Sequence, residues 1–365
     1  MIGADTQAAE VRPAGRMAKA IRDLPPAAFA FVMATGIISV GADAFGPAWL
    51  SRALLVAAAA GLVVLAGMLL ARLVRYPANV AADARAPEKT FGFFTIVAGA
   101  EVVGVRLDAA GHPMVTAVLA MLAAALWLGL TYALPAGLLL TREKGSVLGG
   151  VNGTWLLWVV GTQSLAITAA ALVKAWPAQA GLLAPAAAAL WGIGLVLYLL
   201  LVSIILLRWL TVPMTPAALG PPYWILMGAT AITVRAGAGL LALPADLPIR
   251  VAAGPFVSGF SFVLWSFGTW WIPLLIILGL WRHLAQHWPL TYETALWSVV
   301  FPLGMYSVAT LAYGKVTKLA FMTPIAHVML WVAVAAWIAV AAAGLISLAG
   351  RPHASARPAG VTGGT

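Results

Sequence analysis

The 365-residue chain contains no cysteine and very little charge. Without cysteine it can form neither a disulfide nor a thiolate metal site, and it has no cysteine nucleophile. Only 9% of its residues are Asp, Glu, Lys or Arg, whereas soluble domains carry about 25%. Histidine is also scarce, with five in the chain. These shortages argue against a soluble protein and leave few groups for acid–base catalysis.

Hydrophobic residues make up 63% of the chain and form long runs without charge. Examples are 54–71, 251–281 and 325–350. A helix that crosses the hydrocarbon layer needs about 20 apolar residues. The runs therefore predict an all-α polytopic membrane protein. We expect ten spans, at about 26–46, 52–73, 91–108, 113–137, 151–173, 181–207, 222–243, 253–281, 293–313 and 325–348.

The positions of the basic residues predict the topology. With the N-terminus inside, 14 Lys and Arg fall on the inner side and six on the outer side, and Arg235 lies within a span. The outer six are Arg52, Arg106, Lys174, Arg250, Lys315 and Lys318. Positive residues favour the cytoplasmic side, so both termini are expected there, in a bacterial-type inner membrane. Residues 1–24 form a basic leader, 25–348 the membrane domain and 349–365 a flexible tail. The net charge of +10 is scattered at loop edges, which argues against nucleic-acid binding.

Odd-numbered and even-numbered spans differ in character. Even spans are long and rich in Leu, Ala and Val, as lipid-facing helices are. Odd spans begin with aromatic residues and continue with small ones, a faint internal repeat that suggests five helical hairpins around a central pore. Close packing of small residues explains part of the pattern equally well. On the pore interpretation, the candidate lining residues are Thr35, Gly36, Gly99, Gly161, Thr162, Gly228 and Gly304.

Phe301 is a bulky ring among small residues in the ninth span, directly before Pro302. Proline removes a backbone donor and bends a helix, which could aim the ring inward. An aromatic ring at that place could close a conduit, since a hydrophobic constriction excludes water. The alternative is that Phe301 fills a gap in the core, as aromatic residues commonly do.

Two ionisable residues fall within odd-numbered spans, Glu101 in the third and Arg235 in the seventh. A charge at this depth is costly unless it is paired or hydrated. Arg235 is either a pore cation that attracts anions or one half of a structural pair. For Glu101 the pair with Arg235 is the favoured interpretation, because an unpaired carboxylate would repel an anion.

No motif for a metal, a cofactor or catalysis is evident. His283 and His287 have i, i+4 spacing but lack a third ligand and a nearby base, so we interpret them as solvated loop residues. There is no Ser-His-Asp arrangement and no phosphate-binding loop. An integral membrane enzyme is the rival class, and the scarcity of His, Asp and Glu argues against it.

Five segments together resemble the tellurite-resistance/C4-dicarboxylate transporter family, which includes malate permeases and slow anion channels. They are 29–36 (FAFVMATG), 91–99 (FGFFTIVAG), 152–158 (NGTWLLW), 270–273 (WWIP) and 297–304 (WSVVFPLG). The resemblance extends from about Pro25 to Leu348. It implies a ten-helix subunit, a trimer with a pore in each subunit, and a gate at Phe301. Glu101 departs from the family pattern.

The function expected from the residues and the resemblance is transport of small anions, most plausibly C4-dicarboxylates such as malate. The alternative substrates are inorganic anions such as nitrate, chloride, sulfite or tellurite. No nucleotide-binding motif is present to drive primary transport. The expected partners are the anion, the lipid bilayer and two further copies of the chain, and no cofactor is expected.

Overall fold

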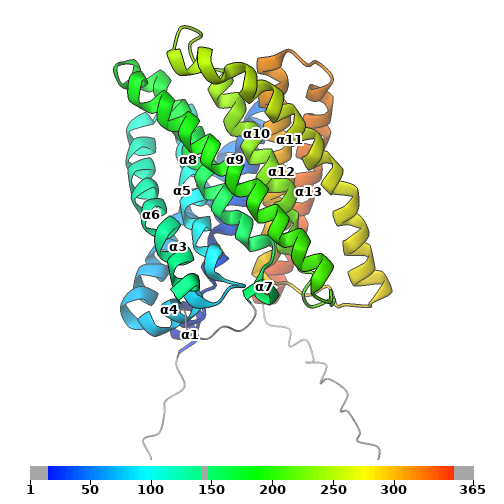
Figure 1. Cartoon of the computed structure of the whole chain (residues 1–365). Coiled ribbons are helices and arrows are strands. Elements are labelled where there is room, and N and C mark those ends of the chain that lie inside the picture. Colours follow the sequence, from blue (N-terminus) through cyan, green and yellow to red (C-terminus); the bar gives the residue numbers. More distant parts are fainter. Residues whose placement is uncertain (1–14, 141–146, 349–365) are drawn as a thin grey trace, which may run out of the picture.

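The computed structural model describes residues 15–140 and 147–348, and all secondary structure in these ranges is helical. Ten described helices are long and apolar enough to cross a membrane, which confirms the predicted number of spans. Most of the leader, Arg142, Lys144 and the tail lie outside the described residues. The two ends of the described chain lie at the same end of the bundle (Figure 1).

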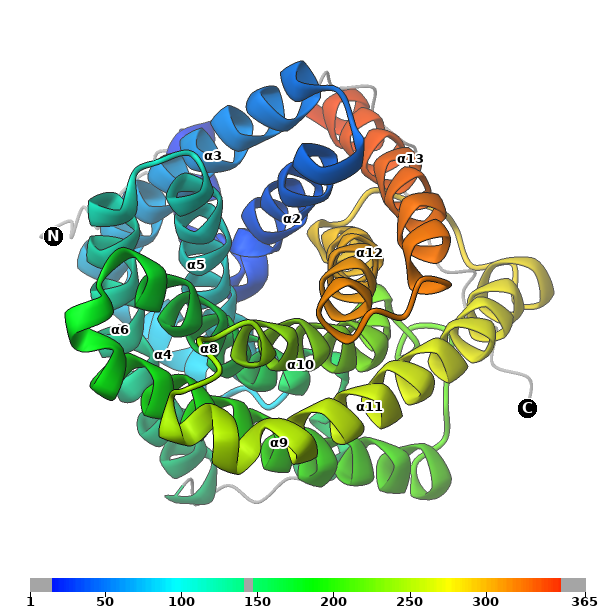
Figure 2. The same ribbon diagram turned by 90° about the horizontal axis from the view of Figure 1, so that it is seen from above.

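The ten helices form an inner and an outer set (Figure 2). In the inner helices, 72–83% of the most apolar stretch is buried, against 11–39% in the outer ones. The inner helices are α2 (Ala30–Phe45), α5 (Phe94–Ala109), α8 (Leu157–Ala175), α10 (Ile225–Leu241) and α12 (Trp297–Thr317). The outer helices are α3 (Ala48–Arg75), α6 (Pro113–Leu140), α9 (Ala180–Thr211), α11 (Pro248–Leu280) and α13 (Met322–Leu348).

The inner helices contact one another in a closed ring. Each contacts the next in chain order, and α12 contacts α2. Each inner helix also packs against the outer helix that follows it in the chain (Figure 2). Short helices α1 (Arg16–Arg22), α4 (Pro77–Arg85) and α7 (Val147–Gly150) lie at the end of the bundle where the described termini are (Figure 1).

The repeat seen in the sequence corresponds to a repeated structure. Every inner helix is preceded by a 3₁₀ turn: η1 (Pro26–Phe29), η2 (Thr90–Phe93), η3 (Gly153–Leu156), η5 (Pro221–Trp224) and η7 (Thr294–Leu296). Four of these turns contain aromatic residues, and the fifth is followed at once by Trp297. The aromatic residues at the starts of the odd-numbered spans therefore mark the turns that lead into the inner helices.

Three tryptophans join neighbouring hairpins, because each lies on the outer helix of one hairpin and bonds to a threonine on the inner helix of the next. In each pair the indole Nε1 donates to a threonine Oγ1 at 2.9–3.0 Å, and such bonds replace water inside an apolar bundle. The pairs are Trp337 with Thr35, Trp127 with Thr162, and Trp265 with Thr310.

Candidate functional site

A small cavity lies where all five inner helices meet. Its volume is about 30 Å³, enough for roughly one water molecule. Residues three or four apart share one face of a helix, and the lining residues follow that spacing. They are Ile37 and Val40 of α2, Glu101, Val102 and Val105 of α5, Ser164 and Ile167 of α8, Ile232 and Arg235 of α10, and Met305 and Val308 of α12. In this structure the cavity is too small for an anion such as malate.

A vestibule of about 500 Å³ adjoins the cavity toward the C-terminal ends of the inner helices. Val105, Ile167 and Arg235 line both spaces. Lys174 and Lys315, in the last turns of α8 and α12, also line the vestibule and are exposed. Asp108 is the acidic residue among the lining residues. Three cations against one carboxylate make the vestibule a positively charged space, which attracts anions.

Arg235 lies at the boundary between the vestibule and the cavity. Within the described part of the chain its guanidinium makes no hydrogen bond and no ion pair. It is partly exposed, because it borders the vestibule. An arginine at membrane depth whose donors face an open space, free of protein acceptors, can bind an anion.

Glu101 lines the same cavity but is 1% exposed. Neither carboxylate oxygen is within hydrogen-bond distance of a partner among the described residues. Thr168 of α8 is a polar neighbour of the carboxyl group, but its hydroxyl bonds to the Ser164 carbonyl at 3.3 Å. The predicted ion pair with Arg235 is not formed, since the ion pairs of the described chain join other residues. The two side chains thus share a cavity without a salt bridge, which corrects the structural-pair interpretation.

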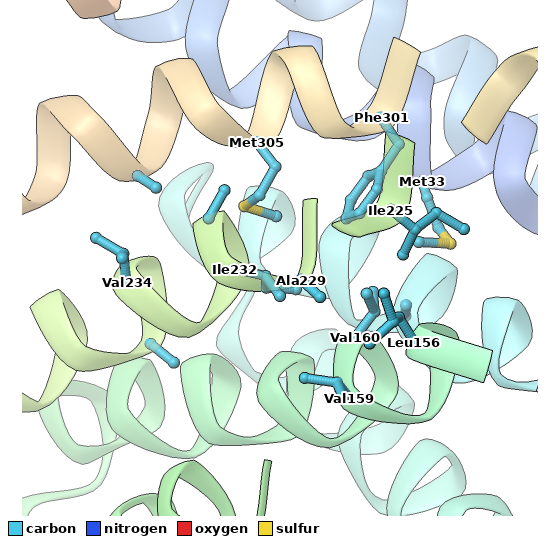
Figure 3. Close-up of a cluster of buried hydrophobic side chains, with 14 of the residues drawn as sticks. Met33, Leu156, Val159, Val160, Ile225, Ala229, Ile232, Val234, Phe301 and Met305 are labelled. Atoms are coloured by element: carbon cyan, nitrogen blue, oxygen red, sulfur yellow. The ribbon is translucent and has the colours of Figure 1, made fainter. Parts of the chain in front are cut away.

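Phe301 lies one helical turn before Met305 on the face of α12 that lines the cavity. Its ring is 1% exposed and belongs to the same buried cluster as Met33, Leu156 and Ile225. Figure 3 shows the ring directed away from α12, next to Ile225 and Met33. Side chains from different inner helices therefore meet around Phe301 on the side of the cavity opposite the vestibule.

Pro302 lies within α12 and packs against α10. A Cβ added to Gly228 would lie 2.8 Å from Pro302 Cγ, which is too close for a real contact. Gly228 therefore permits close approach of α10 and α12 at the turn that carries Phe301. The ring and the proline occupy adjacent positions but contact different neighbours.

The other glycines predicted to line a conduit also lie at contacts between adjacent inner helices. A Cβ at Gly36 would meet Val102, at Gly99 Val32, at Gly161 Phe94, and at Gly304 Ile37. The hydroxyls of Thr35 and Thr162 accept bonds from outer-helix tryptophans. None of these residues lines the cavity or the vestibule. In this structure their small size serves close helix packing, and their place on the wall of an open pathway stays a prediction.

Arg106 is another correction. The charge pattern predicts a cation on the outer side, whereas Arg106 lies in α5 and is 6% exposed. Its Nη2 bonds to Asp43 Oδ1 at 2.6 Å and to Ser51 Oγ at 3.0 Å. Because its charge is neutralised by a carboxylate, Arg106 joins the first two hairpins and is not a free cation.

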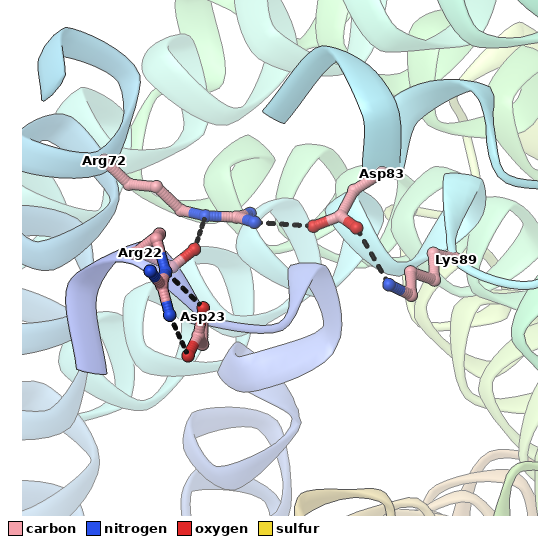
Figure 4. A network of polar contacts seen from close by, with 5 residues as sticks. All are labelled: Arg22, Asp23, Arg72, Asp83 and Lys89. Atoms are coloured by element: carbon pink, nitrogen blue, oxygen red, sulfur yellow. Dashed lines mark hydrogen bonds and ion pairs between the residues drawn. The ribbon is translucent and has the colours of Figure 1, made fainter. Parts of the chain in front are cut away.

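At the opposite end of the bundle, Arg72 donates to the Arg22 carbonyl at 2.8 Å and to Asp83 at 2.7 Å (Figure 4). Lys89 bonds to the other oxygen of Asp83 at 3.0 Å. These residues border a pocket of about 320 Å³ near the first turns of three inner helices. Three acidic and three basic residues line it, so it lacks the positive excess of the vestibule.

Sequence reasoning identified Glu101, Arg235 and Phe301 but missed the vestibule. The sequence predicts Lys174 and Lys315 on the outer side of the membrane, without a role in a site, and Asp108 is not among the predicted site residues. The available signal was helical register: Lys174 follows Ile167 by seven residues, and Lys315 follows Val308 by seven.

No cluster of three His, Asp or Glu that could hold a metal occurs in the described chain. His283 Nδ1 bonds to the Trp288 carbonyl at 2.9 Å.

Comparison with known proteins identifies the family. A model of the SLAC1 family, described as voltage-dependent anion channels, matches residues 23–345. The chain belongs to this family. This confirms the resemblance and makes the protein a member of a family of membrane anion channels and transporters.

Several relatives have similar sequences. A membrane protein of Mycobacterium tuberculosis is 45% identical over 139 residues, which cover 38% of this chain and 70% of that protein. A transporter of Methanocaldococcus jannaschii is 26% identical over 327 residues, which cover 86% of this chain and 90% of the relative. A second transporter from that organism is 31% identical over 145 residues, 39% of this chain and 40% of the relative.

Proposed function

We propose that the protein moves small anions across the membrane along the axis of the five inner helices. The observation that carries this proposal is Arg235, whose guanidinium has no protein partner in the described chain and borders both the vestibule and the cavity. Lys174 and Lys315 concentrate anions at the wider end. Arg235 then offers planar, charged donors of the kind that bind carboxylates in pairs.

The proposed substrates are C4-dicarboxylates such as malate. Three cations around one vestibule suit a doubly charged anion better than a singly charged one. Inorganic anions such as nitrate, chloride, sulfite and tellurite are the second candidates, because a charged vestibule does not distinguish carboxylates by itself.

Phe301 is the proposed gate. Its ring, the neighbouring Met33 and Ile225 and the small cavity leave no room for an anion in this structure. Rotation of the ring would connect the cavity to the far side. A dry apolar constriction of this kind stops ions without a charged plug.

Uptake by proteoliposomes tests the function and the substrate together. We expect protein-dependent, saturable uptake of labelled malate, inhibited by excess unlabelled malate. The same vesicles receive labelled nitrate and tellurite, and protein-free liposomes correct for leakage. Rapid nitrate or tellurite uptake without malate uptake would replace the dicarboxylate by the inorganic alternative. Absence of malate, nitrate and tellurite uptake would refute the proposal.

The proposed topology places both termini in the cytoplasm of a cell with a bacterial-type inner membrane. A reporter that is active only in the cytoplasm is expected to be active when fused after residue 350. The same reporter inserted after Asp246, in the exposed connection from α10 to α11, is expected to be inactive. The reverse pattern would invert the topology. The resemblance further suggests a homotrimer, which the mass of the purified complex measures.

A further inference from the structure

Glu101 is a buried carboxyl group that the proposed anion pathway does not need. It is 1% exposed, both oxygens lack partners in the described chain, and it lines the cavity into which Arg235 also reaches. Buried carboxylates are normally paired or hydrogen-bonded, because burying an unpaired charge is costly. A bound proton would neutralise the carboxylate without the need for a partner side chain.

The charged surroundings of Glu101 are simple. Among the residues that line its cavity, from all five inner helices, Arg235 is the other charged one. On α8 and α12, Lys174 and Lys315 line the vestibule and not the cavity. On α2, Asp43 is held by Arg106.

The outer helices packed against α5 add no charge near Glu101. Helix α6 carries no acidic or basic residue between Pro113 and Leu140. On α3, Arg52 and Arg75 are exposed, and Arg72 is bonded to Asp83. Protonation of Glu101 therefore changes the charge of the cavity by one unit, and the group opposite it that responds is Arg235.

We propose that Glu101 binds and releases one proton together with each anion, so that the protein is a proton–anion cotransporter. This proposal rests on the proposed anion function. When the proton is bound, the carboxyl group is neutral and Arg235 is free to bind the anion. When the proton leaves, the carboxylate repels the anion and attracts the guanidinium across the cavity. Proton and anion thus bind together and leave together.

The structure provides a short route for the proton. Val105 follows Glu101 by one helical turn and lines both the cavity and the vestibule. The cavity has room for roughly one water molecule, and a water there could pass a proton from the vestibule to a Glu101 oxygen. No other reactant is required, since the proton comes from the solvent on one side and returns to the solvent on the other.

The test uses the full-length protein in liposomes with labelled malate, a trapped pH-sensitive dye and the membrane potential clamped at zero. With the outside more acidic by about one pH unit, one proton per anion drives an accumulation of about tenfold. Wild-type protein is expected to accumulate malate and to acidify the interior only when malate is added. Glu101→Gln is expected to equilibrate malate without accumulation and without proton entry. Asp246→Asn, which removes an exposed loop carboxylate, is expected to behave like wild type.

Net uptake of malate into malate-free vesicles at equal starting pH on both sides separates the two proposals. Net malate uptake without proton entry in wild-type vesicles would overturn proton coupling and leave the anion function standing. Proton-coupled accumulation by Glu101→Gln would overturn the role of Glu101. If malate is not taken up, the same measurements are made with nitrate, and absence of both uptakes would refute the anion function and the coupling with it. Glu101→Asp, which keeps the carboxyl group, is expected to restore proton entry if the Gln variant folds poorly.

Discussion

Phe301→Ala is expected to raise anion flux by about tenfold or more, because removal of about 1.4 kcal/mol from a barrier gives a factor of ten. The ring is buried with Met33 and Ile225 on the side of the cavity opposite the vestibule. Truncation to a methyl group would open that position toward the cavity. Conductance in planar bilayers, together with the elution profile of the purified protein, measures both the flux and the folded state.

The competing role for Phe301 predicts the opposite result. If the ring only fills the core, its truncation leaves a cavity that costs about 3–5 kcal/mol and lowers the yield of folded protein. Phe29→Ala is the matched control, since Phe29 is also 1% exposed but packs with Val32, Ala58 and Val103 in a second cluster beside α3. It is expected to lose stability without a gain in conductance. A well-folded Phe301→Ala variant with wild-type conductance would refute the gate. The conductance of Phe301→Leu is expected to lie between those of the wild type and Phe301→Ala.

Much of the fold was predictable because the membrane imposes simple rules. A span must be about 20 apolar residues long, and every backbone group in it must bond internally. Ten spans and the difference between inner and outer helices therefore follow from composition alone. The aromatic residues before Ala30, Leu157 and Ile225 also marked the turns that precede inner helices.

The roles of the small residues could not be predicted in the same way. In the sequence, Gly36 and Gly304 suit a pore wall and a tight helix contact equally well. The structure shows that they lie against Val102 and Ile37, at contacts between helices. The partner of Arg106 is Asp43, 63 residues earlier in the chain, and no local pattern indicates such a pairing. The rotation of each helix about its axis determines both the contacts of the glycines and the pairing of Arg106. Spans as uniformly apolar as these have little periodicity, so their sequence does not predict that rotation.

Arg235→Ala is expected to weaken anion binding about 10- to 100-fold. Hydrogen bonds to charged groups contribute about 1.5–3 kcal/mol, and each 1.4 kcal/mol is a factor of about ten in affinity. The guanidinium has no protein partner in the described chain, so its removal is expected to leave folding intact. Arg235→Lys keeps the charge but not the planar pair of donors, and is expected to retain part of the activity. Uptake measured against anion concentration gives the change in affinity.

Arg106→Ala distinguishes loss of an anion-binding group from loss of any buried arginine. Arg106 lies in another inner helix, α5, but is held by Asp43 and Ser51. Its removal leaves those partners without a cation, so we expect lower thermal stability. The affinity of the remaining folded protein for the anion is expected to change little. Wild-type affinity and flux in Arg235→Ala would show that anions do not bind at the boundary between the vestibule and the cavity.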